Sequence, residues 1–257
     1  MADTGSAERS AVARVFRTLE LLADTPRTPS ELARELGVDR SSALRLLRQL
    51  IATGYVRRDD VDQRYRCVGT RFMSFVSSAP DHADLSDLVD PVLRELRLRY
   101  GEASLLAVPA RGHMVYAVFF PSSQLLGVRE RLGAVRPMHC SAVGKAYLSA
   151  LDDDALEAEL SLLTFVGGTD RAPSDRPSLY RQVAQAREVG YAVDHDETSI
   201  GVSCVAVPLT IGGSLMGSMG VTGPSTRLDA ELTSEIGSEL RRAAQDLRGT
   251  VEPIGQA

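Results

Sequence analysis

The sequence predicts an α+β protein in two parts, a small N-terminal domain of three helices and a β-hairpin and a larger domain of mixed strands and helices. Three observations support this prediction. Apolar residues recur at helical spacing over residues 12–52, with proline and glycine between the periodic stretches. An amphipathic segment follows at residues 88–100. Beyond residue 101, short apolar runs typical of strands alternate with helical segments, an order that indicates an α+β fold.

Composition sets the broad class of the protein. Of its 257 residues, 44% are hydrophobic and 25% are charged, values that are ordinary for a globular chain. No run approaches the roughly 18 apolar residues of a membrane span, and residues 1–14 lack the pattern of a secretory signal. The three cysteines, Cys67, Cys140 and Cys204, are too few and too scattered for a disulfide framework. We therefore expect a cytoplasmic protein with no membrane partner.

Charge is distributed unevenly along the chain, whose formal net charge is −5. Residues 9–71 contain 13 arginines and 8 acidic residues, a balance of +5. Residues 72–257 contain 16 basic and 24 acidic residues, a balance of −8, and the two acidic residues within 1–8 complete the total. A basic N-terminal part followed by an acidic remainder predicts two functions, and the basic part is expected to bind a polyanion.

Three short helices, separated by residues that break or cap helices, are expected in the N-terminal domain. Two prolines in the segment 25–29 end the first helix. A hydroxyl of Thr28 or Ser30 caps the second, since it accepts a free amide hydrogen of the first turn, and Gly37 supplies the left-handed residue that often ends a helix. The expected helices are Val12–Leu22, Ser30–Leu36 and a third that runs from a cap at Asp39 or Ser41 to Ala52.

The third helix and the segment after it carry the functional signal of this domain. The helix has an apolar stripe made of Ala43, Leu46, Leu47 and Leu50, and its opposite face carries serine and arginine. Two short helices joined by a tight glycine turn, the second presenting polar residues outward, form a helix-turn-helix. Residues 56–66 then predict an arginine-rich β-hairpin, which is typical of a wing.

Double-stranded DNA is the partner that this arrangement predicts. Ser41, Ser42 and Arg45, on the outward face of the third helix, are predicted to approach base edges in the major groove. Arg48 and the arginines of the hairpin are predicted to contact phosphates mainly. The alternative is a solvated three-helix domain whose arginines only keep it soluble. The full predicted interface consists of Ser30, Arg40, Ser41, Ser42, Arg45, Arg48, Gln49, Arg57, Arg58 and Arg64.

The remaining chain is expected to form a connector, a linker helix and an α+β sensor domain. Residues 70–83 have mixed composition, and the linker helix spans Leu88–Tyr100. Strands are expected at Ala103–Val108, Met114–Phe120, Gly127–Arg131, Ala192–Asp194, Ser203–Leu209 and Leu215–Val221, and helices at Ser141–Ala150, Asp153–Leu160, Leu179–Val189 and Asp229–Arg248.

Several segments in this order resemble one known family. In the first domain, VFRTLELLADTP and SELARELGVDRSSALRLLRQLIATGYV precede a hairpin that ends in YRCVGTRF. In the second, HCSAVGKA at 139–146 is similar to a helix start of the form H-(A/C)-(T/S)-A-x-G-K-A. The segments GYAVD, GVSCVAVP and GVTGP follow at 190–194, 201–208 and 220–224. Together they resemble the IclR family of bacterial transcriptional regulators over residues 10–248.

This resemblance implies an α+β architecture in which a winged helix-turn-helix is joined by a linker helix to a GAF-like α/β effector-binding domain. It also implies a homodimer or a dimer of dimers on a palindromic operator, and we expect a repressor of catabolic genes. The domains are then a disordered lead at 1–9, the winged helix-turn-helix at 10–71, the connector and linker helix at 72–100, and the effector-binding domain at 101–250.

The family's effector pocket uses an Asp, a Cys ten residues later, main-chain amides at the helix start and two small hydroxyl residues on the last strand. Gly220 stands where one of these hydroxyl residues is usual. Amides at a helix N-terminus attract a carboxylate, and an Asp accepts a hydrogen bond from a ligand hydroxyl. We therefore expect a small hydroxy, keto or aromatic carboxylic acid as effector, with no cofactor and no metal. The resemblance places the pocket at Ser141, Ala142, Val143, Gly144, Asp194, Cys204 and Thr222.

Other interpretations of these residues remain open at this point. Cys204 is also typical of a small buried core residue, and Asp194 of a strand-end residue that faces solvent. A metal- or redox-responsive regulator would use His139, Cys140, Asp194 and Cys204, although no short metal-ligand spacing is present. A thiol enzyme would pair Cys204 with His195, but His195 directly follows Asp194 and no nucleophile elbow accompanies them. We therefore do not expect an enzyme.

Overall fold

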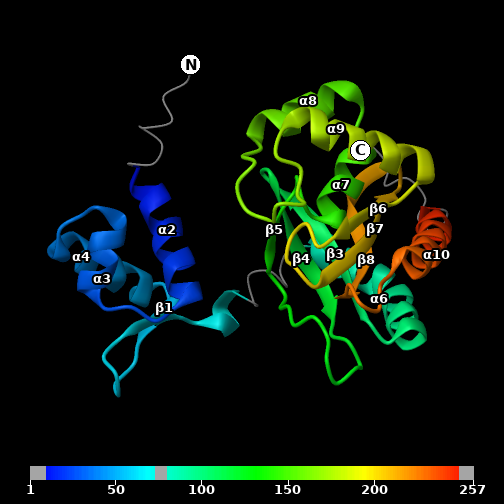
Figure 1. Ribbon diagram of the computed structural model, residues 1–257. Helices are drawn as coiled ribbons and strands as arrows, with labels where there is room; N and C mark the ends of the chain where they lie inside the picture. Colours follow the sequence, from blue (N-terminus) through cyan, green and yellow to red (C-terminus); the bar gives the residue numbers. More distant parts are fainter. Residues whose placement is uncertain (1–9, 73–79, 249–257) are drawn as a thin grey trace. The chain divides into compact units, whose positions relative to one another are not determined.

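The computed structural model describes residues 10–72 and 80–248, and for residues 80–84 only the backbone (Figure 1). These residues fall into two compact units that divide between Ala83 and Asp84. The expected lead at 1–9 and most of the expected connector lie outside the described residues. Within the described part, no helix is both long enough and apolar enough to cross a membrane.

Among its described residues, the N-terminal unit contains the three predicted helices, a two-stranded antiparallel hairpin and a helical segment at 69–72. Its caps resolve the alternatives that the sequence left open. The side chain of Thr28 accepts from the amide of Glu31, and Asp39 caps the next helix by accepting from Ser42. Gly37 has φ +63° and ends the helix before it. The elements are α2 (Ala11–Asp24), α3 (Pro29–Leu36), α4 (Arg40–Ala52), β1 (Val56–Arg58) and β2 (Tyr65–Cys67).

A small core joins the hairpin to the helices. The main chains of Arg27 and Tyr65 exchange two hydrogen bonds, of 3.0 and 2.8 Å, so the segment between α2 and α3 pairs with β2. The Tyr65 side chain is buried together with residues from each helix. The hairpin is thereby fixed against the helices, as a winged helix-turn-helix requires. The buried cluster consists of Leu21, Leu22, Leu32, Leu47, Leu50, Val56 and Tyr65.

The C-terminal unit is built on a six-stranded antiparallel sheet with the strand order β5-β4-β3-β8-β7-β6 (Figure 1). Its strands are β3 (Ala103–Ala110), β4 (His113–Phe120), β5 (Val135–Pro137), β6 (Ala192–His195), β7 (Val202–Ile211) and β8 (Ser214–Pro224). Its helices are α6 (Pro80–Tyr100), α7 (Ala142–Ser149), α8 (Asp153–Leu162), α9 (Arg176–Val189) and α10 (Ala230–Arg248).

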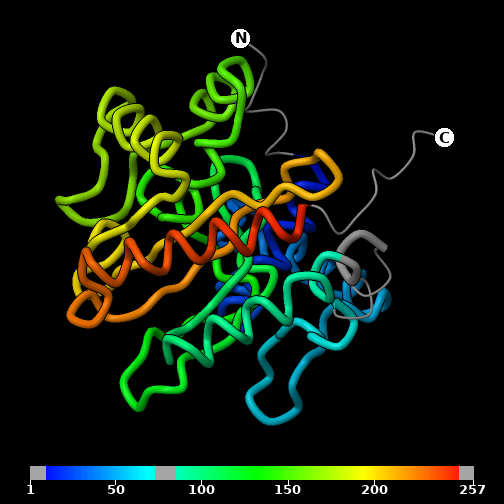
Figure 2. The backbone as a smooth tube through the Cα atoms, turned by 90° about the vertical axis from the view of Figure 1, so that its right-hand side faces the viewer, coloured from blue at the N-terminus to red at the C-terminus, as the bar shows by residue number. Residues whose placement is uncertain are grey.

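Helices cover both faces of this sheet, which explains why its central strands are apolar almost throughout. On β3, Leu105 belongs to the core shared with α7, α8 and α9, and its neighbour Leu106 belongs to the core shared with α6 and α10. Figure 2 brings α6 and α10 to the front, lying side by side across the second face. Because alternate side chains enter two separate cores, each strand contributes to both. The helix-turn-helix and the α+β architecture of the C-terminal unit in the predicted fold are confirmed.

Two expected elements differ from the structure. The strand predicted at Gly127–Arg131 is absent, and its place in the sheet is taken by β5. The predicted segment contains the consecutive charged residues Arg129, Glu130 and Arg131, which leave it no face to bury. The linker helix begins at Pro80 rather than at Leu88.

Candidate nucleic-acid interface and candidate ligand cavity

Helix α4 turns its apolar stripe inward and its polar face to solvent. Ala43, Leu47 and Leu50 are buried. Arg45 and Arg48, on the other face, are exposed, as the helical spacing predicts. The outward face of α4 is therefore free to enter a groove of DNA.

A hollow of about 560 Å³ lies between α3, α4 and the hairpin. Four of the predicted interface residues line it, namely Ser30, Arg40, Arg48 and Arg58. Within the described chain, Arg40, Arg45 and Arg48 take part in no ion pair, so their charge is available to a partner. A concave surface with unpaired arginines suits a phosphate backbone. The hollow is lined by Thr28, Pro29, Ser30, Arg40, Leu44, Arg48, Arg58, Gln63 and Tyr65.

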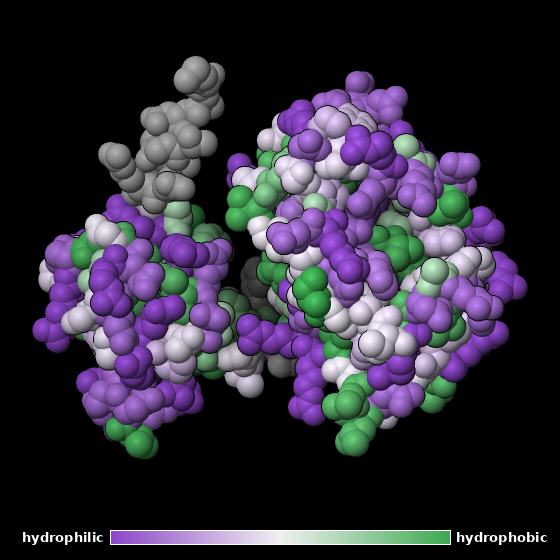
Figure 3. Space-filling model, in the orientation of Figure 1, coloured by the Kyte–Doolittle hydropathy of each residue, from purple (hydrophilic) through white to green (hydrophobic). Residues whose placement is uncertain are grey.

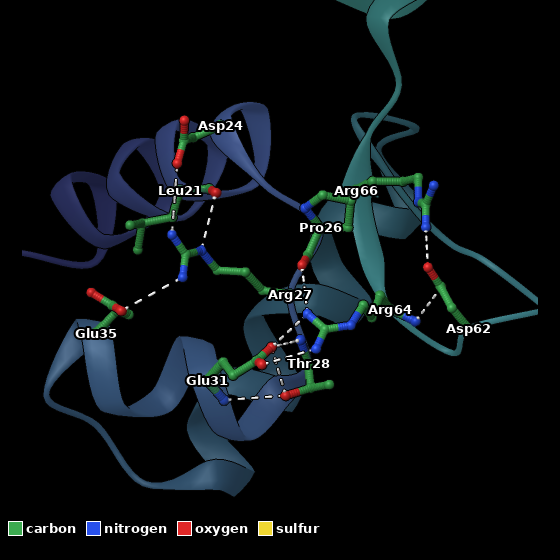
Figure 4. A network of polar contacts seen from close by, with 10 residues as sticks. All are labelled: Leu21, Asp24, Pro26, Arg27, Thr28, Glu31, Glu35, Asp62, Arg64 and Arg66. Carbon is green, nitrogen blue, oxygen red and sulfur yellow. Dashed lines mark hydrogen bonds and ion pairs between the residues drawn. The ribbon is translucent and has the colours of Figure 1, made fainter.

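Arg64 has a different environment from the other predicted interface residues. Its guanidinium donates to both carboxylate oxygens of Glu31, each at 3.0 Å, and to the carbonyl of Pro26 at 2.8 Å (Figure 4). A fork-to-fork pair of this kind fixes both orientation and distance. Arg64 therefore ties the hairpin to the start of α3, a role that sequence reasoning missed because the partners are far apart in the chain.

The pKa of Glu31 is lowered to about 2, chiefly by the amide of Thr28 and then by Arg64. Its ordinary value is 4.5. A carboxyl whose pKa falls on folding stabilises the folded state above its unfolded pKa and loses that contribution as the pH falls through the folded value. This contribution of Glu31 should therefore disappear between about pH 4.5 and about pH 2.

Replacing Glu31 with glutamine should loosen the hairpin at neutral pH and remove this acid dependence. Glutamine keeps the acceptor of the capping box but not the charge that holds Arg64. Hydrogen exchange of α3 and β2, compared between about pH 6 and about pH 3, measures the effect. The Glu35→Gln variant, which removes a charge from the same helix, is the control. An equal acid response in both variants would contradict the assigned role.

The hydroxyls of Ser41 and Ser42 are already engaged at the start of α4. Ser42 donates to Asp39 through its amide at 2.9 Å and its hydroxyl at 2.6 Å, and the hydroxyl of Ser41 donates to the same carboxylate. These bonds hold the pKa of Asp39 well below its usual range. Base contacts by either serine would have to use the free lone pairs of its oxygen or exchange the bond to Asp39.

A second candidate site is a cavity of about 40 Å³ inside the C-terminal unit. It brings together six of the seven residues predicted for the effector pocket. The exception is Gly144, whose amide donates to the Ser141 hydroxyl and whose Cα packs against the main chain of Met138. The lining consists of Tyr116, Val128, Glu130, Arg136, Ser141, Ala142, Val143, Asp194, Thr198, Ser199, Val202, Cys204 and Thr222.

Strand register explains how distant residues reach one wall of this cavity. Asp194 on β6 lies opposite Cys204 on β7, and Cys204 lies opposite Thr222 on β8. The ten-residue spacing of Asp194 and Cys204 is therefore the length of an antiparallel hairpin, and all three residues share one face of the sheet. A Cβ at Gly220 would lie 2.6 Å from the carbonyl of Val205, so no side chain fits at that position.

The start of α7 forms the opposite wall. The Ser141 hydroxyl caps the helix and donates to the carbonyl of Pro137 at 2.7 Å. The amides of Ala142 and Val143 are first-turn donors that have no acceptor within the helix. Both residues line the cavity, so this wall presents amide hydrogens to an anion.

Asp194 is more constrained than the sequence indicated. Its carboxylate accepts from the amide of Glu197 at 2.8 Å, the amide of Thr198 at 3.2 Å and the hydroxyl of Thr198 at 2.5 Å. Burial nonetheless raises the pKa of Asp194, with these hydrogen bonds opposing it. The side chain shapes the loop after β6 and keeps one lone-pair position for a ligand.

The two thiols near this site are poor nucleophiles. Burial raises the pKa of Cys204 far above its usual value and that of Cys140 to about 11, so both remain protonated near neutral pH. Register places His195 opposite Ser203, on the other side of the strand from Asp194. Among the described residues, no group of three or more His, Cys, Asp or Glu side chains is placed to hold a metal ion.

Sequence reasoning missed Tyr116, Glu130, Arg136 and Thr198 in the cavity wall. They come from β4, β5 and the loops beside the sheet, and no local pattern marks them. The pairing of β4 with β5, which matches Val115 with Val135, sets Arg136 beside β4, and Thr198 lies in the loop between β6 and β7.

Comparison with known protein families gives two matches. The IclR helix-turn-helix domain matches residues 11–60, and the C-terminal domain of the bacterial transcriptional regulator IclR matches residues 77–248. The HTH-type transcriptional repressor AllR of Escherichia coli (strain K12) is 27% identical over 222 residues, covering 85% of this chain and 80% of AllR. The HTH-type transcriptional regulator KdgR of the same organism is 25% identical over 240 residues, covering 93% of this chain and 91% of KdgR.

Solved structures share the fold. An IclR homologue from Microbacterium hydrocarbonoxydans in complex with 4-hydroxybenzoate has a TM-score of 0.78 at 22% identity, covering 94% of this chain and 100% of that one. The IclR of Thermotoga maritima has a TM-score of 0.70 at 23% identity, covering 92% of this chain and 96% of that one.

Proposed function

This chain belongs to the IclR family of bacterial transcriptional regulators, and we propose that it represses catabolic genes until a small organic acid binds its C-terminal domain. It is a ligand-responsive DNA-binding regulator. Its relatives are named as regulators and repressors rather than enzymes. The metal-responsive alternative has no supporting cluster among the described residues.

The proposed DNA interface is the outward face of α4 together with the hollow beside the hairpin. Arg45 reads base edges, and Arg48 and Arg58 hold phosphates. We keep Arg57 at the margin of the proposed interface, because its guanidinium already pairs with the carboxylate of Asp59 at 3.5 Å. Arg64 positions the hairpin instead of binding DNA. The interface otherwise keeps the predicted residues Ser30, Arg40, Ser41, Ser42 and Gln49.

The proposed effector site is the cavity between the start of α7 and the sheet. The observation that carries this proposal is the row of Asp194, Cys204 and Thr222, which faces the free amides of α7. A carboxylate suits the amides, and a hydroxyl suits the free lone pair of Asp194. A second carboxylate on the ligand would meet the buried Asp194, which disfavours dicarboxylates. The 4-hydroxybenzoate bound by the Microbacterium homologue has this combination of groups.

Cys204→Leu should abolish the response to the effector while DNA binding without effector persists. The added carbon atoms fill a cavity of only about 40 Å³, and the overpacking should lower the free energy of unfolding by about 1–3 kcal/mol. Hydroxy and keto acids, aliphatic and aromatic, are screened by thermal shift, and DNA release by each ligand that binds is then measured. Cys204→Ser, which conserves volume, is the control. An effector response retained in Cys204→Leu would place the ligand elsewhere.

A homodimer, or a dimer of dimers, on a palindromic operator completes the proposal. One winged helix contacts few base pairs, and two symmetric copies multiply specificity. Helix α2 exposes Val12 and Phe16, and α6 exposes Leu98, so either helix offers an apolar contact. Light scattering of the unaltered chain and of Phe16→Glu should show a dimer or larger assembly that the substitution weakens if α2 forms the contact. A monomer at micromolar concentration, with and without DNA, would refute this proposal.

A further inference from the structure

Arg136 is a cation in the wall of the effector cavity, and a side chain of the same chain already occupies it. Its guanidinium pairs with the carboxylate of Glu130, which also lines the cavity. Both side chains are largely shielded, with 25% and 21% of their surfaces exposed. Neither residue belongs to the strand row or to the helix start that carry the proposed site.

The arginine is held in place independently of this pair. It extends from β5, its guanidinium lies over the ring of Tyr116 at 5.7 Å, and it donates to the carbonyl of Val135 at 3.1 Å. Tyr116 in turn stacks on Phe119 with a centroid separation of 6.1 Å. Removing Glu130 should therefore leave the cation at the cavity, aimed as before.

Glu130, by contrast, comes from the segment between β4 and β5, which contains neither helix nor strand. The tip of this segment exposes Leu125 and Leu126, with 95% and 76% of their surfaces accessible. The hydrophobic patch at the lower edge of the C-terminal unit in Figure 3 lies at this tip. Arg227 holds the carbonyl of Leu126 at 2.8 Å, but among the described residues the main chain of 127–130 makes no hydrogen bond, so Glu130 is the mobile partner of the pair.

The size of the cavity makes such a movement necessary. A volume of about 40 Å³ holds a few water molecules, since one needs roughly 10–15 Å³ of such space. An organic acid with several carbon atoms needs more. When Glu130 leaves, the cavity gains the volume of its side chain and Arg136 loses its counter-ion.

We propose that Arg136, together with the amides of α7, recognises the carboxylate of the effector, and that Glu130 occupies Arg136 in the unliganded protein as an internal competitor. This inference rests on the proposed effector site and adds its charge-recognition residue. One carboxylate replaces another on the same guanidinium, so the charge in the cavity is conserved. The displaced Glu130 moves into water, where an ionised carboxylate is well solvated. Neutral analogues of the effector cannot make this exchange.

The same segment connects the exchange to the linker helix. Its first residues are bonded to the end of α6: Arg97 donates to the carbonyl of Pro121 at 2.6 Å, and the hydroxyl of Ser122 donates to the carbonyl of Gly101 at 2.7 Å. A displacement of Glu130 is therefore transmitted along one short segment to the C-terminal end of α6.

Chemical rescue by acetate tests the proposal without DNA and without knowledge of the effector. Glu130→Ala in the full chain removes the competitor and leaves a space that acetate fits. Thermal unfolding is followed over increasing sodium acetate, with sodium chloride at equal ionic strength as reference. We expect acetate to bind Glu130→Ala about tenfold or more tightly than the unaltered protein, and Glu130→Ala/Arg136→Met to show no specific response. Hydrogen exchange of residues 121–134 should quicken in Glu130→Ala and should stay fast with acetate, because acetate restores the charge partner of Arg136 but not the link to this segment.

Glu157→Ala is the matched control, because it removes a carboxylate from an exposed ion pair with Arg176 at 3.6 Å. If Glu130→Ala folds poorly, Glu130→Gln takes its place, with the hydrogen exchange of 121–134 as the measurement. An equal acetate response in all variants, or none in Glu130→Ala, overturns the proposal. That result leaves the proposed function intact if an organic acid still releases DNA, whereas acetate rescue without any acid-dependent DNA release would count against the function alone.

Discussion

Replacing Lys145 with methionine is expected to lower the free energy of unfolding of the C-terminal unit by about 3–5 kcal/mol. Lys145 is the only lysine in the chain, and its side chain is 1% exposed. Its ammonium donates to both oxygens of Glu197, at 2.7 and 2.6 Å, and to the side chain of Gln182 at 2.5 Å. Methionine fills similar space without the charge, so the buried carboxylate of Glu197 loses its partner.

The loss of unfolding free energy in Lys145→Met should depend on pH, and its direction follows from the pKa of Glu197. Burial raises the pKa of Glu197 to about 7, with Lys145 opposing the rise. A carboxyl with a raised folded pKa binds more protons in the folded state, so stability falls as the pH rises from the ordinary value of 4.5 towards the folded value. Without Lys145 the deficit should be greatest above neutral pH and should shrink towards about pH 4.5.

Urea denaturation of the full chain at several pH values measures this effect. Lys145→Met/Glu197→Gln should recover much of the loss, because no unpaired charge remains. Arg176→Met, which breaks an exposed pair, should change stability by less than about 1 kcal/mol. A deficit below about 1 kcal/mol in Lys145→Met would mean that water reaches Glu197.

This pair also positions the proposed effector site. The amide of Glu197 donates to Asp194, so Lys145 holds the loop on which the Asp194 carboxylate is built. The motif HCSAVGKA contains Lys145, but the sequence indicates no partner for it, because Glu197 follows 52 residues later in the chain, after α8, α9 and β6. A motif residue can thus be recognised long before its physical role is known.

Local chemistry predicted the elements of this fold well. The caps at Thr28 and Asp39, the glycine at 37 and the apolar stripe of α4 depend on neighbours within a few residues, which a sequence displays directly. The ten-residue spacing of Asp194 and Cys204 was also informative, because a single hairpin places the two residues opposite each other on β6 and β7. The predicted strand at 127–131 was wrong because its three consecutive charged residues leave no face to bury.

Long-range pairing could not be predicted in the same way. In the sequence, Arg64 cannot be distinguished from the other arginines of the hairpin, and only the fold shows that Glu31 is its partner. Arg136 and Glu130 become a cavity wall only after β5 is added to the edge of β4. In each case the partner is chosen by tertiary packing, which has no signature in the spacing of residues.

Arg45→Ala is expected to weaken binding to the preferred DNA sequence by about 5- to 150-fold, equivalent to about 1–3 kcal/mol, and to relax the preference at one base-pair position. Arg45 projects from the exposed face of α4 and takes part in no ion pair within the described chain. A guanidinium there has both donors free for the edge of a guanine. The substitution therefore removes a contact that Arg45 makes with the preferred DNA sequence and not with other sequences.

Duplexes selected from a random pool by the unaltered protein serve as the preferred DNA, and affinities are measured against unselected duplexes at several salt concentrations. Arg34→Ala is the matched control, since it removes the same charge from α3, outside the predicted interface. Arg58→Ala should instead weaken binding to all duplexes alike and lower the salt slope by about one. If Arg45→Ala selects the same sequence with unchanged affinity, α4 is not inserted as proposed, and the interface must be sought on another face of the domain.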